Sequence, residues 1–433
     1  MANISFYKSC EPPKSNHRFN ITEQTDEPNN DYEVTEEEIS LIGPNMRQIN
    51  YIPTNTNILL FFEKVTKCGH IACKLVDTEL PDSILKILSR TDPIDEPQLI
   101  IPSFSILRNL LGFGLKKEDL VLKEFHGILK NIIGKLMVAN TNYNCVNAVI
   151  DLISDFSSDP IQFSFFYESG VISFLFFFIG KRHPLNTIAL VLESLYKVLK
   201  LNNKFWNNTQ NGEVSTWRLV CDNEIIPILF DYLNESDNNI YINDCQLIGY
   251  LSFNNEYMFE KMQQEYFDLI INNLLIDDMD HQNATLDMIA AMISTDTLAK
   301  YWIEYPIFPA LIDLCDNAAF QVQKSAFKII SNIFTYYYKE TTNYIIKLGT
   351  FNFFLKFLET ENINIIDRTL ECISTILNFL SNNNGYDSLK ILYNNSQETF
   401  EMINNMENEE DISEQIQESI CLINSIIDDM EKH

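Results

Sequence analysis

Three soft metal ligands lie within six residues of the sequence, in the fragment Cys68-Gly-His70-Ile-Ala-Cys73. Thiolate sulfur and imidazole nitrogen suit Zn²⁺, but a structural zinc site needs four such ligands, usually in two pairs. No second pair follows nearby, and only His126 or Cys145 offer a further ligand that the fold could bring close. We therefore predict no metal site and expect buried thiols beside a surface histidine.

The segment GFGLKK, from Gly112 to Lys117, is a second place where chemistry is conceivable. Two glycines before a lysine pair resemble a phosphate-binding loop, but the preceding strand and the full Walker spacing are missing. The segment follows an apolar helical stretch, as a helix C-cap does, so we interpret it as a turn. The six histidines form no recognisable catalytic phrase with a serine or cysteine. We predict no catalytic residue, no cofactor and no enzymatic activity.

The charge of the chain is strongly acidic. There are 31 Lys and Arg against 60 Asp and Glu, which gives a formal net charge of −29. Such a field repels phosphate backbones and anionic membranes, so basic proteins or extended basic peptides are the expected partners and nucleic acid is not. An alternative interpretation is that the charge only keeps a long helical protein soluble.

The cysteines and the N-terminal residues bear on location. Nine cysteines are scattered singly, which is typical of free thiols in a reducing compartment. The start, MANISFYKSCEPPK, has no apolar core of a secretory signal. The most apolar run, VISFLFFFI, has nine residues, whereas a membrane-spanning helix needs about 20. We expect an intracellular protein, cytoplasmic or nuclear, without a membrane span.

The elements that would position any site recur along the chain. From about residue 80, a short amphipathic helix and then a longer one repeat in units of roughly 40–47 residues, a period typical of HEAT and armadillo arrays. The run VISFLFFFI is then the inner helix of one unit. We predict an acidic, mostly disordered tail over 1–54 and an α-solenoid over 55–433. The solenoid would hold about eight repeats, a degenerate ninth at 55–79, an insertion near 203–223 and an acidic capping repeat at 398–433.

Two phrases make these units similar to armadillo repeats. Glu168-Ser169-Gly170-Val171-Ile172 resembles the armadillo entry E-x-G-x-I-P-x-L, in which glycine permits a sharp turn. The stretch FQVQKSAFKIISNIF (320–334) resembles the third-helix pattern E-V-Q-x-x-A-x-W-A-L-S-N-I-A. The resemblance implies an all-α, right-handed solenoid of armadillo-type repeats.

Within that superfamily, the phrases most resemble importin-α-like nuclear-transport adaptors. In that family a ladder of Trp-x-x-x-Asn pairs on third helices holds an extended basic peptide. The resemblance implies that Asn109, Asn332 and Asn378 line such a peptide-binding groove. The positions four residues before them hold no tryptophan; they are Ser105, Lys328 and Ser374.

Three functions therefore stay open at the level of the sequence. The chain is expected to be a protein- or peptide-binding scaffold, in its most specific form a transport adaptor. The alternative is a cytoskeletal or signalling scaffold with no transport role. A site assembled from distant repeats, which leaves no local motif, is the third.

Overall fold

The computed structural model describes most of the chain, and its regular structure there is entirely α-helical. The described residues are 34–50, 54–122, 125–137, 141–157, 163–180, 183–200, 225–253, 258, 262–293, 302, 307–348, 351–360, 362–383, 386–406 and 414–432. Contacts divide the chain into two compact units, Met1–Phe174 and Leu175–His433. No helix in the described ranges is long and apolar enough to traverse a lipid bilayer.

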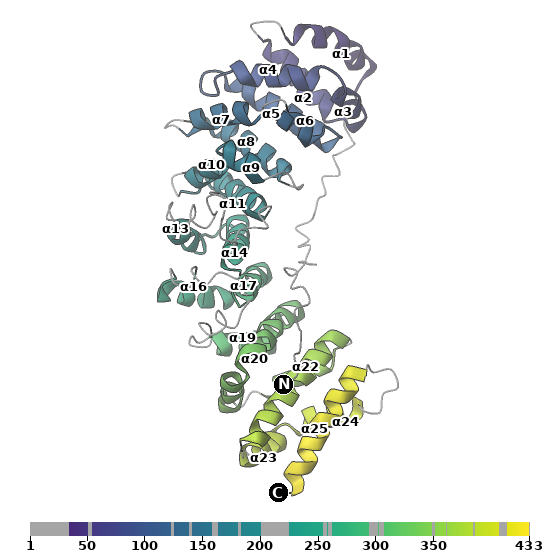
Figure 1. Ribbon diagram of the computed structural model, residues 1–433, viewed down its shortest axis with the longest axis vertical. Helices are drawn as coiled ribbons and strands as arrows, with labels where there is room; N and C mark the ends of the chain where they lie inside the picture. Colours follow the sequence, from purple (N-terminus) through teal and green to yellow (C-terminus); the bar gives the residue numbers. More distant parts are fainter. Residues whose placement is uncertain are drawn as a thin grey trace. The chain divides into compact units, whose positions relative to one another are not determined.

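The first unit stacks helices in layers (Figure 1). Its helices are α1 (Glu36–Gln48), α2 (Thr56–Thr66), α3 (Gly69–Val76), α4 (Leu80–Arg90), α5 (Pro97–Gly112), α6 (Lys117–Leu122), α7 (Phe125–Leu136), α8 (Tyr143–Phe156) and α9 (Phe163–Glu168). Helix α5 packs against α2 on one side and α8 on the other, while α4 contacts α7. Equivalent helices of successive repeats therefore stack on one another, which is the construction of a solenoid.

The second unit continues the same pattern. Its helices are α11 (Leu185–Lys200), α13 (Ile225–Tyr232), α14 (Asn238–Ser252), α16 (Gln264–Leu274), α17 (Met279–Met292), α19 (Ile307–Asn317), α20 (Phe320–Leu348), α21 (Phe353–Leu358), α22 (Ile363–Asn382), α23 (Tyr386–Asn395), α24 (Gln397–Met406) and α25 (Glu414–Lys432). The long helices α11, α14, α17, α20, α22 and α25 each contact the next one in this order. The predicted all-α solenoid is confirmed.

Short polar turns set where the long helices begin. Asn142, Asp237 and Asn362 each stand at the N-cap of a long helix, where a side-chain oxygen accepts hydrogen bonds from backbone N–H groups of the first turn. A cap of this kind stabilises a helix by about 1 kcal/mol. The asparagine-rich and acidic turns that end each short helix in the sequence therefore have a structural use.

Two helices, α10 and α20, depart from this regular pattern. Helix α10 (Val171–Phe178) contains the boundary between the units, and its Val171, Phe174 and Phe178 are buried. The predicted inner helix within VISFLFFFI is thus present. Helix α20 has a non-helical residue, Tyr337, with φ −133° and ψ 48°, so it is a long third helix joined directly to the first helix of the next repeat.

The predicted tail over residues 1–54 needs a correction at its C-terminal end. Residues 36–48 form helix α1. Thr35 accepts from the Glu38 backbone N–H and the Glu38 carboxylate accepts from the Thr35 N–H, which is a capping box. Lys64 of α2 also donates to Glu38 at 2.7 Å. Residues 1–33 and the predicted insertion at 203–223 lie outside the described residues.

Candidate functional site

Seven long helices, α5, α8, α11, α14, α17, α20 and α22, each have two positions, four residues apart, that are not buried and lie among buried residues; all of these positions except Ala291 hold polar side chains. In α20, for example, Lys328 is exposed and Asn332 half-buried, whereas Ala326, Ile330 and Ile333 are buried. We call the two positions of each helix its ladder positions. When the long helices are aligned on their buried residues, the ladder pairs are Ser105/Asn109, Asp151/Asp155, Glu193/Lys197, Gln246/Tyr250, Asp287/Ala291, Lys328/Asn332 and Glu371/Thr375. Because residues at i and i+4 lie on one face of a helix, each pair forms one patch.

The register places two of the three predicted asparagines on the ladder and one beyond it. Asn109 and Asn332 hold the second ladder position of α5 and α20. In α22 the buried run around Ser374 matches the run around Ser331, so the second position is Thr375. Asn378 follows three residues later, about one helical turn along the same face. All three asparagines are half-buried.

In the first unit, the ladder residue Asn109 is already bonded within the protein. Its side-chain amide donates to Thr66 Oγ1 at 3.0 Å and to the Glu63 carbonyl oxygen at 3.5 Å, both at the C-terminal end of α2. Thr66 is fully buried and donates in turn to the Phe62 carbonyl. This asparagine therefore fastens α5 to α2, and the donor nitrogen of its amide is already used within the protein.

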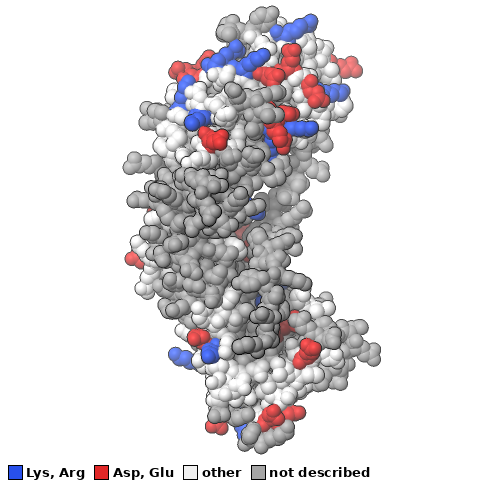
Figure 2. All heavy atoms as spheres, viewed as in Figure 1, with Lys and Arg blue, Asp and Glu red and all other residues white. Residues whose placement is uncertain are grey.

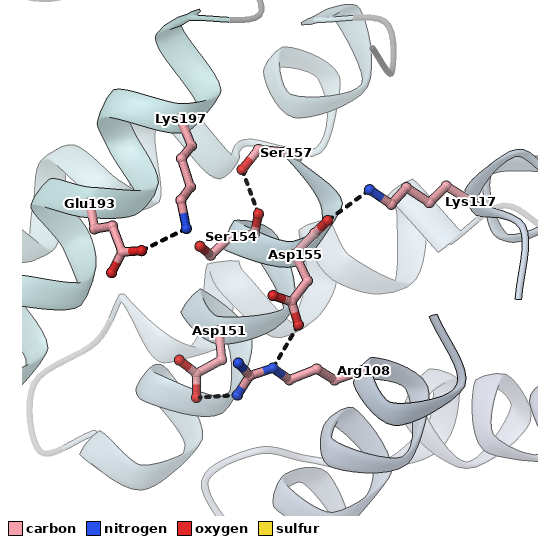
Figure 3. Close-up of polar contacts among 8 residues, drawn as sticks. All are labelled: Arg108, Lys117, Asp151, Ser154, Asp155, Ser157, Glu193 and Lys197. Atoms are coloured by element: carbon pink, nitrogen blue, oxygen red, sulfur yellow. Dashed lines mark hydrogen bonds and ion pairs between the residues drawn. The ribbon is translucent and has the colours of Figure 1, made fainter. Parts of the chain in front are cut away.

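The acidic ladder pair of α8 is also occupied from within the first unit (Figure 3). Arg108 of α5 reaches between Asp151 and Asp155, with its Nε 2.6 Å from Asp155 Oδ2 and a terminal nitrogen 3.5 Å from Asp151 Oδ2. One guanidinium thus pairs with both carboxylates. Beside it, the buried Lys117 donates to the carbonyl oxygens of Asp155 and Phe156 at the end of α8. Cations at this helix end also favour the helix dipole.

In the second unit, the ladder pair of α11 and one ladder residue of α14, Tyr250, are closed in a similar way. Glu193 and Lys197 form an ion pair within α11 at 2.6 Å. The Tyr250 hydroxyl of α14 donates to the Leu199 carbonyl at 2.8 Å, and its ring meets that of Tyr196 edge-on. Burial raises the pKa of Tyr250, so this phenol stays protonated and keeps its donor role.

The ladder of α20 is open. The side chains of Lys328 and Asn332 make no hydrogen bond or ion pair with any described residue, and the same holds for the side chains of Gln246 in α14 and Asn378 in α22. Their side chains supply amide donors, amide acceptors and one ammonium group to the surface. Among the described residues, the polar side chains of Gln246, Lys328, Asn332 and Asn378 are therefore left for a ligand, and we call these four residues the open ladder.

A pattern of asparagine and tryptophan identifies few of the ladder residues, because most of them have other side chains. Asp151, Asp155, Glu193 and Lys197 hold equivalent positions with other side chains. The signal that identifies them is the burial period of the long helices, which the apolar residues of the sequence already carry.

The two motifs considered for metal and phosphate lie on α2–α3 and after α5. Cys68 is the residue before α3, and the side chains of His70 and Cys73 are exposed within it. The expected surface histidine is present, but the expectation of buried thiols is wrong, because Cys68 is half-buried and Cys73 exposed. Among the described residues, no group of three His, Cys, Asp or Glu side chains is arranged to hold a metal ion. Gly114 has a φ of 111°, so the GFGLKK segment contains the turn that was predicted.

Comparison with known proteins gives structural but not sequence relatives. No family model and no curated protein matches the chain. Its structure resembles a crystal structure titled only as an engineered protein, with a TM-score of 0.59 and 12% identity over 89% of this chain and 98% of that one. Computationally designed armadillo repeat proteins for modular peptide recognition give 0.47, with 16% identity over 59% of this chain and 99% of theirs. A further designed armadillo repeat protein gives 0.43, with 14% identity over 56% and 94%. The first likeness shows the fold, and the other two show nothing further.

Proposed function

We propose that this chain is a non-catalytic scaffold that binds an extended segment of a partner protein along the open ladder of its second unit. The observation that carries the proposal is the state of Asn332. It occupies the same ladder position as Asn109, yet it has no hydrogen bond within the described part of the chain. A primary amide both donates and accepts, so it matches the N–H and C=O of an extended backbone.

Charge supports a basic segment as the partner. Residues 219–299 contain 15 Asp and Glu but a single lysine, Lys261, and no arginine. Over α1–α6 of the first unit, by contrast, both signs are mixed on the face drawn in Figure 2. A basic segment would gain long-range attraction at α14–α17, while Lys328 would favour an acidic or neutral residue at one point.

The stricter form of this proposal is a nuclear-transport adaptor for basic peptides. The likeness of residues 320–334 to an armadillo third helix supports it. Lys328, which stands where the transport ladder has its tryptophan, weighs against it, because an ammonium group repels the lysine or arginine that a tryptophan face would hold. A scaffold in the cytoskeleton or in signalling needs no tryptophan ladder. Both forms place the protein in the cytoplasm or nucleus.

Fluorescence anisotropy tests the proposal with labelled twelve-residue peptides. One peptide carries a lysine–arginine cluster, a second has the same residues in scrambled order, and a third is acidic. We expect the basic peptides to bind and Asn332→Ala to weaken that binding about tenfold, the equivalent of about 1.4 kcal/mol. The matched control is Asn272→Ala, an exposed asparagine of α16 away from the ladder.

Each outcome decides something. Equal affinity of the wild type and Asn332→Ala would refute binding at the open ladder. A preference for the clustered peptide over the scrambled one supports the transport form. Identical binding of the two basic peptides would exclude that form and leave a general basic-segment scaffold.

A further inference from the structure

Three successive long helices of the second unit begin with a large apolar residue that faces solvent. Met279, Phe320 and Ile363 are the first residues of α17, α20 and α22, and their side chains are 52%, 56% and 57% exposed. The three helices contact one another in this order. The three residues therefore form a row along one edge of the unit, which we call the apolar edge.

The edge is wider than three side chains. Leu275 and Ile276, in the turn before α17, are also exposed, by 54% and 43%. Single exposed apolar residues are ordinary on protein surfaces, but a run of them at one structural position in consecutive repeats marks an interaction surface. The first position of a helix needs no apolar residue for helix formation, since capping there depends on polar groups such as Asn362.

The edge also includes a hollow that side chains of a partner could enter. An open depression of about 690 Å³ is lined by Phe320 and by the end of α21 and its turn, through Lys356, Glu359, Thr360 and Asn362. Phe320 thus lines the hollow, and Ile363 directly follows another of its lining residues, Asn362.

The charges around the apolar edge are mostly negative. Asp277, Asp278 and Asp280 flank Met279 in the sequence, and the exposed Asp313, Asp316 and Glu359 lie at the ends of the short helices α19 and α21. The lysine of the hollow, Lys356, is already held by Asp316, at 3.4 Å from its carboxylate and 2.6 Å from its carbonyl oxygen. Lys324, four residues after Phe320 in α20, is a further cation near the edge, but the carboxylates outnumber the two lysines. The net charge around the edge is therefore acidic.

We propose that the apolar edge is a second docking surface, and that its partner is a cationic amphipathic segment whose apolar side chains cover Met279, Phe320 and Ile363. Basic residues of the segment would meet the surrounding carboxylates. This surface is distinct from the open ladder, because it lies at the helix starts, whereas Asn332 lies twelve residues further along α20. The two sites can thus bind two segments or two parts of one partner.

Binding of three labelled eighteen-residue helical peptides to the full chain tests this proposal. The first is built from leucine and lysine, the second replaces leucine with serine, and the third replaces lysine with glutamate. We expect the leucine–lysine peptide to bind at least tenfold more tightly than either of the others, because only it offers both apolar contact and positive charge.

The protein variants locate the site. Phe320→Ser combined with Ile363→Ser should weaken the leucine–lysine peptide at least tenfold. Ile391→Ser on α23, which is 61% exposed, serves as a control of equal chemistry and should leave binding unchanged. All three positions are exposed, so the fold should persist, and far-ultraviolet circular dichroism checks it.

Two results would overturn the apolar edge. One is equal binding of the serine–lysine peptide, which would mean charge alone. The other is equal affinity of the double variant and the wild type. Asn332→Ala separates this proposal from the first one: it should weaken the extended basic peptide but leave the leucine–lysine peptide unaffected.

Discussion

The side-chain amide of Asn109 donates a hydrogen bond to the hydroxyl of Thr66 across 3.0 Å, from one long helix to the next. Asn332 has the same ladder position in its own repeat and no such partner among the described residues. One residue type at one repeat position therefore has two uses: it holds helices together in the first unit and faces solvent in the second. The difference comes from what the preceding long helix offers, because α2 ends in a threonine next to α5.

Asn109→Ala is expected to destabilise the first unit by about 1 kcal/mol, the usual net value of one hydrogen bond. The loss should be somewhat larger if the buried Thr66 hydroxyl oxygen finds no other donor in place of the Asn109 amide. Asn332→Ala should change stability by less than about 0.5 kcal/mol, as a surface substitution does. Hydrogen exchange of peptides from α2 and α20 measures both effects separately. The assignment would be wrong if Asn332→Ala accelerated exchange in α20 more than Asn109→Ala accelerated exchange in α2, each relative to the wild type.

A second expectation concerns Asp244 of α14, which is fully buried and has no hydrogen-bond partner for either carboxylate oxygen. Burial raises its pKa well above the ordinary value, and no lysine or arginine is described in α13, α14, α16 or α17 to offset this. The equivalent positions in α17 and α22 hold Thr285 and Thr369, whose hydroxyls each donate to a carbonyl four residues earlier at 2.7 Å.

Asp244→Thr should therefore stabilise the second unit at neutral pH by about 1–3 kcal/mol, the typical penalty of an unsatisfied buried polar group. The effect should depend on pH. An unfolded Asp releases its proton near pH 3.8, while the folded one keeps it to higher pH, so wild-type stability falls as pH rises from there through the folded pKa. The variant lacks this loss, and its advantage should be larger at pH 7 than at pH 4.

Hydrogen exchange in α14 and α17 at the two pH values, corrected for intrinsic rates, gives the measurement, because a chain of two units need not unfold in one step. Asp244→Ala, which removes the carboxylate but leaves space, is the companion variant. A wild type that exchanges as slowly as Asp244→Thr at pH 7 would show that the carboxylate is accommodated without penalty.

The sequence predicts the helices of this protein better than it predicts the ladder residues. The solenoid follows from the apolar period of the long helices and from turn residues such as Asn142 and Asn362, which are local signals. Residues 36–48 have few apolar residues, and the sequence therefore predicts a disordered tail there. The local signal for a helix is the Thr35–Glu38 capping box.

The ladder was predicted less well, because its chemistry depends on neighbours from other repeats. Nothing near Asn109 in the sequence indicates Thr66, 43 residues earlier, as its partner. Likewise, Arg108 and the pair Asp151 and Asp155 come from different helices. The resemblance to the armadillo third helix points to Asn378 in α22, whereas the buried pattern places Thr375 at the ladder position. Residue type alone does not fix register.

A third expectation compares two helical glycines. A Cβ atom at Gly249 of α14 would lie 3.3 Å from the Met288 Cα and 3.5 Å from the Ala291 Cβ of α17, whereas nothing lies within 4 Å of a Cβ at Gly134 in α7. Alanine is the better helix former by about 1 kcal/mol, so Gly134→Ala should stabilise its unit. Gly249→Ala should instead destabilise by about 1 kcal/mol net, because backbone atoms of α17 must move, at about 1–3 kcal/mol.

Exchange protection in α7 and in α14 reads out the two glycine variants independently. Higher protection of α14 in Gly249→Ala would mean that the two helices separate easily, and that their close approach is not what holds these repeats together.

A fourth expectation concerns Gly170, between α9 and α10, whose φ of +79° lies in the left-handed region. A Cβ atom there would have nothing within 4 Å, so the effect of an alanine comes from the backbone alone. Gly170→Ala should lower stability by about 1–2 kcal/mol. Gly170→Asn should lose less, since asparagine tolerates this conformation. Hydrogen exchange of the segment 163–180 measures the order glycine, asparagine, alanine. Equal protection in all three would mean that the turn relaxes to a negative φ, in which case the armadillo-like phrase around Glu168 and Gly170 would not depend on glycine.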